Sequence, residues 1–371
     1  MKQRKALIWH WGRRGGAYFY GLEISRVLAQ LPGLDLHMSV SRQGEGYEGF
    51  QQLSLPGLAV NTYRNVPTAL TAMVRLPFIQ RRFFRYLDDN QIQVVYCPSL
   101  HIWSPFFLRG IRRRNLRFIL TIHDAVAHPG EGQPWKNWWI ESAIRTAHTH
   151  ITLSDHVKNK MMARYGLESD QIHVIPLGAF DYSEGKAQPR NLPSNRPCRL
   201  LFFGRILEYK GIGLLLEAFK LLKQRYPELK LTIAGGGDFS PYQDAADKLD
   251  GIDLRIGWVE ESDIARLFQQ SDILVCPYIE ASQSGSVAVA LGFGMPVVAT
   301  SVGGLSEQVI EGQTGFLAKG TTPKSIAAAL DKLISNPAVY NRCSVNALQD
   351  ARSRFSWETV AKGVHKLLIA S

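Results

Sequence analysis

Short apolar segments recur along the whole chain and alternate with longer segments of helical periodicity. Several of the apolar runs are hydrophobic at consecutive positions, which is typical of strands covered on both faces of a sheet. Between them, stretches such as 211–226 place apolar residues at the spacing of an amphipathic helix. The predicted strands are 6–10, 35–40, 92–97, 117–122, 149–154, 171–176, 199–204, 229–235, 252–257, 272–277 and 296–301.

This alternation predicts an α/β fold with parallel, doubly wound sheets. It occurs twice, on either side of a polar stretch rich in Pro and Gly over 181–198. At 371 residues the chain also exceeds what one hydrophobic core usually serves. We therefore expect two Rossmann-like domains facing a cleft, over 1–185 and 199–353, with a linker over 186–198 and a closing segment over 354–371.

One run in the second half carries no charge. The 26 residues between Glu280 and Glu307 have no charged side chain, although 20% of the whole chain is charged. A membrane span needs about 20 apolar residues, but Pro296 and several glycines would break the backbone pairing that lipid demands. We interpret the run as a helix over about 285–293, a tight turn, a buried strand and a glycine loop.

The composition indicates a folded globular protein of a reducing compartment. Hydrophobic residues make up 45% of the chain, and the four cysteines are scattered without a CxxC pair. That arrangement argues against a disulfide framework or a zinc site. The N-terminal segment has a basic head but too short an apolar run for a signal peptide, so a cytoplasmic protein is expected.

Positive charge is concentrated in the first half. Residues 1–190 hold 24 Lys and Arg against 14 Asp and Glu, so they carry nearly all of the net charge of +11. Basic clusters at 75–86 and 109–118 interleave cations with aromatic rings, which suits an anionic membrane surface. The alternatives are a solvated basic face over core aromatics, or nucleic-acid binding, which no RRM, KH or zinc-finger pattern supports. The aromatic residues concerned are Phe83, Phe84, Tyr86, Phe118, Trp135, Trp138 and Trp139.

Ligands of doubly wound sheets bind beyond the carboxyl ends of strands, at helix N-termini, so the loops after strands are the places to search. Arg205 and Lys210 follow one predicted strand and precede a helix, an arrangement that suits a phosphate group. Farther along, the backbone N–H groups of Ser284, Gly285 and Ser286 could hold an anion without any charged side chain. The plain alternatives are two surface cations and an ordinary helix cap.

Two further loops lie in the first half. Gly15 and Gly16 would let the backbone approach a ligand closely before a helix begins. His123 ends a strand beside Asp124, although a lone histidine is more often structural than catalytic. The motifs GxGxxG, GxxxxGK[ST], DxD, HExxH and GxSxG are all absent, so no metal site is expected. The charge of a diphosphate would then be met by Arg205, Lys210 and helix dipoles.

Taken in order, these motifs resemble the family-four retaining glycosyltransferases of the GT-B fold. The similarity covers most of the chain and is dense in the second half, with "FFGRILEYKGIGLLLEAF", "LKLTIAGGGD", "LRIGWVEESDIARLFQQSDILVCPY" and "LGFGMPVVATSVGGLSEQVIEGQTGFL". In the first half, "RRGGAYFYGLEISRVL", "TIHD" and "ITLSDHVKNKMMARYGLESDQIHVIPLG" look like its acceptor-domain motifs. Together they are specific for the family but not for a substrate.

The resemblance implies a role for each motif. It implies an acceptor-binding first domain, a second domain for the nucleotide sugar, and a C-terminal helix over 354–371 that crosses back to the first domain. His123, Arg205 and Lys210 are the implied catalytic residues: the histidine contacts the donor sugar and the two cations grip its diphosphate. The implied donor-binding residues are Gly15, Gly16, Gly257, Val259, Glu260, Glu280, Ser282, Gln283, Ser284, Gly285 and Ser286.

The family also implies the chemistry. A UDP- or GDP-linked sugar would pass to a glycan or lipid-linked saccharide, with no cofactor or metal. The product of such a reaction would belong to bacterial polysaccharide or glycolipid synthesis. Retention is thought to proceed by front-face attack, with the leaving phosphate accepting the acceptor's proton, which suits a chain without a clear pair of catalytic carboxylates. The enzyme would act in the cytoplasm, peripherally on the inner face of the plasma membrane.

One departure from the family pattern affects this interpretation. The family usually has two glutamates eight positions apart, and the corresponding positions here are Ala281 and Val289. Glu280 is one residue away from the first, and Gln283 is a candidate substitute for the ribose contact. The alternatives are therefore a weakly active or non-catalytic relative that binds glycans or nucleotides, or a GT-B sugar-nucleotide epimerase or phosphorylase.

Overall fold

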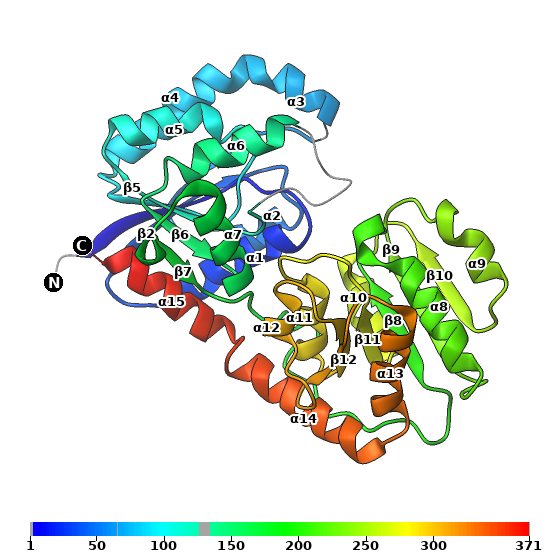
Figure 1. Ribbon diagram of the computed structural model, residues 1–371. Coiled ribbons are helices and arrows are strands. Elements are labelled where there is room, and N and C mark those ends of the chain that lie inside the picture. The colour runs from blue at the N-terminus through cyan, green and yellow to red at the C-terminus, as the bar shows by residue number, and fades with distance from the viewer. Residues whose placement is uncertain (1–2, 65, 126–133, 371) are drawn as a thin grey trace. The chain divides into compact units, whose positions relative to one another are not determined.

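The computed structural model describes residues 3–64, 66–125 and 134–370, and they form two compact units (Figure 1). The first unit comprises the described residues up to Pro176 together with the closing segment from Trp357. The second unit comprises Leu177–Ser356. Each unit is built on its own parallel sheet, so the two doubly wound sheets predicted from the alternation of strands and helices are confirmed.

The first unit contains a seven-stranded sheet in the order β3-β2-β1-β4-β5-β6-β7. All neighbouring strands are parallel, and the order reverses between β1 and β4. The strands are β1 (Arg4–His10), β2 (Leu34–Ser41), β3 (Gly57–Val60), β4 (Val94–Cys97), β5 (Arg117–Ile122), β6 (Thr149–Thr152) and β7 (Ile172–Val174).

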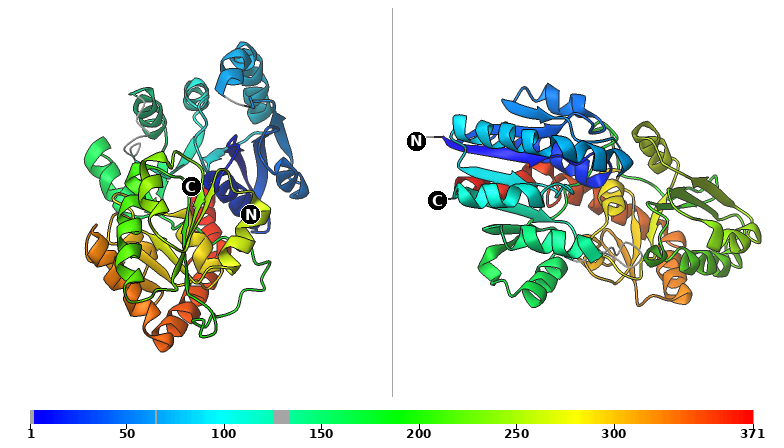
Figure 2. Two further views of the ribbon diagram at one scale, coloured as in Figure 1. Left: turned by 90° about the vertical axis from the view of Figure 1, so that its right-hand side faces the viewer. Right: turned by 90° about the horizontal axis from the view of Figure 1, so that it is seen from above.

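Helices cover both faces of this sheet, as right-handed crossovers require (Figures 1 and 2). One face packs against α4 to α7 through a core that includes Trp9, Phe83 and Phe107. The other face carries α1, against which the C-terminal helix α15 packs. The helices are α1 (Gly16–Leu28), α2 (Tyr47–Gln52), α3 (Val66–Ala72), α4 (Leu76–Asp89), α5 (Pro105–Arg113), α6 (Pro134–Ile144), α7 (Asp155–Tyr165) and α15 (Trp357–Ile369), with short 3-10 turns η1 (Met73–Arg75) and η2 (Ser169–Gln171).

The second unit contains a six-stranded parallel sheet in the order β10-β9-β8-β11-β12-β13, which reverses between β8 and β11. The central strands β8, β11 and β12 are almost entirely apolar and covered on both faces, and this explains their consecutive hydrophobic residues. The strands are β8 (Arg199–Phe203), β9 (Lys230–Gly235), β10 (Ile252–Ile256), β11 (Ile273–Cys276), β12 (Val297–Thr300) and β13 (Gly315–Ala318).

Helices again cover both faces of the second sheet: α8 packs against α13, and α11 packs against α14 (Figure 2). The helices are α8 (Ile212–Lys223), α9 (Gln243–Asp247), α10 (Glu261–Gln269), α11 (Gly285–Gly292), α12 (Leu305–Gln308), α13 (Pro323–Ile334) and α14 (Pro337–Arg352), with 3-10 turns η3 (Glu208–Lys210) and η4 (Ser240–Tyr242). The charge-free run forms α11, a turn and the buried strand β12, as expected. Among the described residues, no helix is long and apolar enough to cross a membrane.

The boundary between the units differs from the expected one. The units divide at Pro176 and Leu177, not at the polar stretch 186–198. That stretch is anchored in the second unit because the Arg190 guanidinium donates hydrogen bonds to the carbonyls of Phe268, Ser271 and Phe293. A buried arginine that caps three carbonyls ties the segment down, although its composition is that of a linker.

Candidate functional site

The predicted phosphate-binding loops meet at the reversal point of the second sheet. Arg205 and Lys210 follow β8, and the loop 277–284 follows β11, its neighbour across the reversal. Helices leave these two strands on opposite faces, and such a reversal point is where doubly wound sheets bind their ligands. The structure thus brings together two sequence segments that lie about 70 residues apart.

Glycine makes the contact between these two loops possible. Gly211 has φ +69°, and a Cβ there would lie 1.9 Å from the carbonyl oxygen of Pro277. Next to it, the backbone N–H of Ile279 donates to the carbonyl of Tyr209 over 2.7 Å. Any other residue at position 211 would push the loops apart, because backbone atoms cannot move aside as a side chain can.

The two cations have different surroundings. The ammonium of Lys210 lies 3.7 Å from the centre of the Tyr278 ring, and the side chain is half-buried. Arg205 is exposed at the same edge. A cation held over an aromatic face keeps its charge while its position is fixed, so Lys210 is the pre-positioned member of the pair. Tyr278 carries no charge, and sequence analysis did not select it.

The amide-lined loop is confirmed as a helix start, but one of its three proposed donors is already occupied. Ser284 caps α11 and accepts from the N–H of Val287. Its own N–H donates to Oε1 of Gln308 over 2.7 Å, and Nε2 of Gln308 donates back to the Ser284 carbonyl over 3.1 Å. The expectation that the Ser284 amide faces an anion is therefore wrong.

The amides of Gly285 and Ser286 remain in the first turn of α11, where a helix supplies no internal acceptor. A Cβ at Gly285 would meet no heavy atom within 4 Å, so the backbone there is open to approach. The Ser286 hydroxyl donates to the carbonyl of Phe203 over 2.6 Å and ties α11 to the end of β8. Two backbone donors, not three, are thus presented beside the cations.

The residues before α11 are mostly enclosed. Ser282 is 4% exposed, and Glu280 is half-buried. The side-chain oxygen Oε1 of Gln283 is buried and has no hydrogen-bond partner in the described part of the chain. Ala281 and Val289, which the resemblance aligns with two glutamates, are buried as well. A buried amide oxygen without a partner costs free energy in the absence of a ligand, so Gln283 points to a binding role.

The segment after β10 lies at the same carboxyl edge, two strands from β8. Gly257 has φ +143°, and its N–H donates to the carbonyl of Gly235 over 3.0 Å. Val259 is half-buried, while Glu260 is exposed and precedes α10 without a side-chain cap. The segment therefore offers mainly backbone groups at this edge.

In the first unit, Gly15 and Gly16 form the start of α1 after β1. Gly15 has φ +74° and caps the helix without a side-chain hydrogen bond. A Cβ at either glycine would meet no heavy atom within 4 Å. The expectation of a backbone surface that a ligand can approach fits this geometry, and the first N–H groups of a 13-residue helix point to it.

His123 follows β5 at the carboxyl edge of the first sheet, and its environment fixes its tautomer. Nε2 lies 2.9 Å from the carbonyl oxygen of Pro98. A carbonyl can only accept, so Nε2 carries the proton and Nδ1 is left as an acceptor. Burial lowers the pKa of His123, and the Pro98 hydrogen bond only partly opposes this, so the neutral ring prevails at pH 7.

A buried hydroxyl cluster, unseen in the sequence, supports His123. The Tyr20 ring meets that of His123 edge to face, with centroids 5.2 Å apart. The Tyr20 hydroxyl lies 3.0 Å from that of Tyr96, which lies 3.0 Å from Oγ1 of Thr121. These three polar groups come from α1, β4 and β5, so no local motif announces them.

Besides His123, the first unit buries His10, His37, His101 and His150, and two of them, His10 and His101, have very low pKa values. Burial lowers the pKa of His10 to about 3, and neither ring nitrogen has a hydrogen-bond partner among the described residues. Burial likewise lowers the pKa of His101 to about 3, and Arg13 and His10 add repulsion. His10 packs so closely under α1 that a Cβ at Gly21 would lie 2.7 Å from its ring. Both are core residues that remain neutral at pH 7.

Gly15, Gly16 and His123 belong to the first unit, and the other predicted site residues belong to the second. Within the described ranges, no three His, Cys, Asp or Glu side chains are grouped as metal ligands would be. The residues that sequence reasoning missed are Tyr20, Tyr278 and Gln308. Of these, only Tyr278 carried a signal, because it directly follows a predicted strand.

Both halves of this chain are similar in sequence to known proteins. Residues 14–179 match the family model described as Glycosyltransferase Family 4, and residues 185–350 match the one described as Glycosyl transferases group 1. A D-inositol 3-phosphate glycosyltransferase of Paenarthrobacter aurescens is 30% identical over 378 residues, covering 94% of this chain and 91% of that protein. An uncharacterized glycosyltransferase of Methanocaldococcus jannaschii is 28% identical and covers 82% of this chain and 83% of its own length.

Solved structures agree with this fold. The crystal structure of HepE from Anabaena, determined in complex with UDP, matches with a TM-score of 0.73 at 18% identity and covers 98% of this chain and 99% of that one. The two parallel-sheet units are those of the GT-B architecture.

Proposed function

Because the chain belongs to family four of the glycosyltransferases, with the GT-B fold, we propose that it transfers a sugar from a nucleotide sugar to a glycan or lipid-linked saccharide, with retention of anomeric configuration. One observation carries this proposal. The sequence places Arg205, Lys210 and the start of α11 on separate segments, and the fold joins them at the reversal point of one sheet. A diphosphate is the ligand that suits two cations and a helix N-terminus at such a point.

We assign the donor's diphosphate to Arg205, Lys210 and the amides of Gly285 and Ser286. In the transfer step, the bond between the sugar's anomeric carbon and the phosphate oxygen breaks, and a bond to the acceptor oxygen forms on the same face. The acceptor's proton passes to the departing phosphate oxygen. The two cations stabilise the negative charge that develops on this leaving group, and such stabilisation is usually the largest catalytic term.

The remaining predicted residues take the sugar and the nucleoside. The Nδ1 atom of His123 accepts a hydrogen bond from a hydroxyl of the donor sugar, while Gly15 and Gly16 lie against the diphosphate. The segment from Gly257 to Glu260 flanks the base. Oε1 of Gln283, buried without a partner, accepts a ribose hydroxyl where the family has a glutamate. The UDP complex of HepE, a protein of the same fold, supports UDP-linked sugars as the first donors to test, before GDP-linked ones.

The test is product analysis with a panel of UDP- and GDP-sugars and glycan or lipid-linked saccharide acceptors. The proposal predicts a new glycosidic product whose anomeric configuration, read by NMR coupling constants, equals that of the donor. An inverted product would contradict the retaining mechanism. A free epimerised nucleotide sugar formed without an acceptor would instead identify an epimerase.

A second function is favoured by one observation. Ala281 and Val289 are buried apolar residues at the glutamate positions, and a bidentate contact to ribose contributes on the order of 1–3 kcal/mol. A relative that binds nucleotide sugars or glycans without transferring them is therefore the competing proposal. Saturable donor binding without any transfer or hydrolysis, across the same donor panel, would favour it.

A further inference from the structure

The basic cluster at 75–86 is divided between core and surface by the helical period of α4. Leu76, Ile79, Phe83 and Leu87 face the core. Tyr86 is held by His37, whose Nδ1 lies 2.7 Å from its hydroxyl. Phe118 of the second basic cluster is also fully buried. The aromatic residues of these clusters are thus mostly core residues, and a row of rings for stacking against nucleic-acid bases is not present among them.

The outward side of this segment combines apolar and cationic side chains. Val74 is 85% exposed and Phe78 is 63% exposed, both unusual for large apolar residues in water. Arg75, Arg82 and Arg85 are exposed beside them. No ion pair holds any of these three arginines within the described part of the chain, although Arg114, which directly follows α5, is paired with Asp88 over 2.8 Å.

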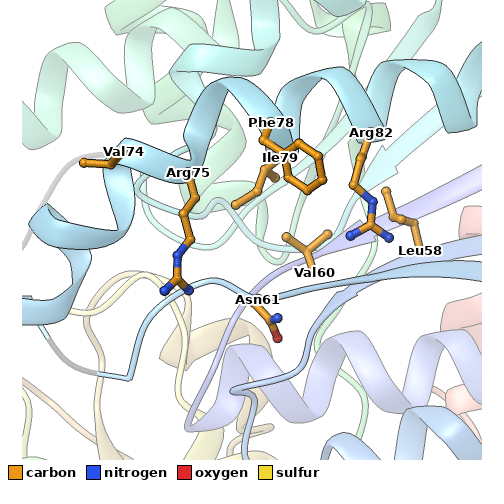
Figure 3. A pocket seen from close by; sticks show the side chains of 8 residues that line it. All are labelled: Leu58, Val60, Asn61, Val74, Arg75, Phe78, Ile79 and Arg82. Atoms are coloured by element: carbon orange, nitrogen blue, oxygen red, sulfur yellow. The ribbon is translucent and has the colours of Figure 1, made fainter.

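A pocket of about 340 Å³ opens beneath these side chains, between α4 and β3 (Figure 3). Its floor is apolar, formed by Leu58, Val60 and Ile79. Arg75 and Arg82 stand on either side of Phe78, and their guanidinium groups reach toward the strand side of the pocket (Figure 3). The geometry joins an apolar recess to two cations at its rim.

We propose that this surface, the α4 ledge formed by Val74, Arg75, Phe78, Arg82 and Arg85, docks on an anionic lipid bilayer. Phe78 and Val74 insert among the acyl chains, the arginines bind lipid phosphates, and the pocket accepts part of an acyl chain. Three arginines without an ion pair among the described residues give the charge complementarity to an acidic bilayer, and the exposed Asp89 lies one turn beyond Arg85 at the end of α4. A nucleic acid would match the charge but not the exposed aliphatic side chain and apolar pocket.

The proposal locates the transferase where a lipid-linked acceptor is found, but its test needs no catalysis. Its failure would therefore leave the transferase assignment intact. Near acidic lipid each arginine contributes about 1 kcal/mol, which is about fivefold in partitioning.

The experiment is co-sedimentation of the full chain with vesicles of phosphatidylcholine, with and without phosphatidylglycerol. The wild type is expected on the anionic vesicles only. The variant Arg75→Gln/Arg82→Gln/Arg85→Gln should bind about a hundredfold more weakly. The matched control Lys248→Gln/Lys319→Gln/Lys324→Gln removes the same charge from exposed positions of the second unit and should bind like the wild type. Equal losses in the two triple variants would overturn the assignment to the ledge.

Insertion is tested by Phe78→Trp, which keeps the apolar surface. The fluorescence that this residue adds, measured as the difference from the wild type with its eight tryptophans, should shift to the blue on anionic vesicles and be quenched by phosphatidylglycerol brominated on its acyl chains. Val345→Trp, at a 47% exposed position of α14, should show neither effect. Absence of quenching in Phe78→Trp, equal binding to neutral vesicles, or retention on single-stranded RNA without retention on vesicles would each overturn the proposal.

Discussion

The carboxyl edges of the two sheets have similar topology but present different chemical groups around their predicted site residues. In the first unit the edge is formed by His123 and the buried hydroxyl cluster of Tyr20, Tyr96 and Thr121, all neutral at pH 7. In the second unit the edge presents Arg205, Lys210 and a helix N-terminus. We call the surroundings of His123 the neutral edge, although Arg13 and Arg14 follow β1 elsewhere on the same sheet, and we call the surroundings of Arg205 and Lys210 the positive edge.

The largest effect is expected from removing the cations of the positive edge. Arg205→Ala/Lys210→Ala removes two charge-assisted contacts of about 1.5–3 kcal/mol each, so kcat/KM for donor turnover should fall by about 10²- to 10⁴-fold. The matched control is Arg199→Ala/Lys230→Ala, which removes cations from the amino ends of β8 and β9 in the same sheet. Steady-state kinetics that showed equal losses in both double variants would mean that position at the edge is irrelevant.

The second prediction concerns pH and separates the units by their histidines. The second unit has no histidine within 177–356, whereas His10 and His101 of the first unit have pKa values lowered to about 3. Below pH about 6.5 these two histidines bind protons in the unfolded chain, whereas in the folded chain their rings stay unprotonated until the pH approaches 3. Stability is therefore complete above that pH and declines as the pH falls toward 3, by about 1.4 kcal/mol per pH unit for each histidine.

At pH 5 these two histidines alone should have cost the first unit about 4 kcal/mol relative to pH 7. The lowered pKa values of His37, His123, His150 and His173 act in the same direction. Denaturant titration followed by tryptophan fluorescence can measure this, because Trp258 is the only one of the eight tryptophans within 177–356. Replacing His101 with Gln should flatten the pH dependence, because an amide does not titrate. A fluorescence transition that is insensitive to pH between 5 and 7 would contradict the burial of neutral histidines.

A smaller effect sharpens the account of the amide-lined loop. Gln308→Leu removes both hydrogen bonds to Ser284. It leaves the buried N–H of Ser284 unpaired, while the Ser284 carbonyl still accepts from the N–H of Ala288, so the free energy of unfolding should drop by about 1–3 kcal/mol. Chemical denaturation of the second unit measures this loss. The control is Gln313→Leu, because the Gln313 side chain makes no hydrogen bond to Ser284. Equal stabilities for the two variants would show that the hydrogen bonds between Gln308 and Ser284 contribute nothing to the free energy of unfolding.

The smallest effect tests the neutral edge. Tyr20→Phe removes one hydroxyl from the buried cluster but keeps the ring against His123, so stability should fall by about 1 kcal/mol. The histidine tautomer should not change, because Pro98 fixes it. Nitrogen NMR of the labelled ring should report a protonated Nε2 in both proteins. A protonated Nδ1 would refute the assigned tautomer.

Much of the scaffold could be predicted from sequence because its signals are local. Consecutive apolar residues mark β8 and β11, and the expected helix at 285–293 was observed as Gly285–Gly292. Strands β3 and β13 were missed, because each has four residues, begins with glycine and follows a loop. Such short strands owe their pairing to neighbours in the sheet, and a reading of local pattern cannot supply that.

The candidate site divides in the same way. Arg205, Lys210 and the start of α11 could be found because they directly follow strands. The hydrogen bonds between Gln308 and Ser284 could not be found from sequence, because the two residues lie 24 positions apart and neither is charged. The tertiary fold also determines which backbone N–H groups are available to a ligand, because the Ser284 N–H already donates to Gln308.

The most direct test of the central claim is calorimetric binding of UDP, UMP and uridine to the wild type and to Arg205→Ala/Lys210→Ala. If the positive edge of the second unit holds the diphosphate, affinity should increase strongly from uridine to UDP in the wild type. In the double variant, that increase should largely disappear while uridine binding stays the same. Equal affinities for UDP and uridine in the wild type, or an undiminished preference for UDP in the variant, would contradict the account.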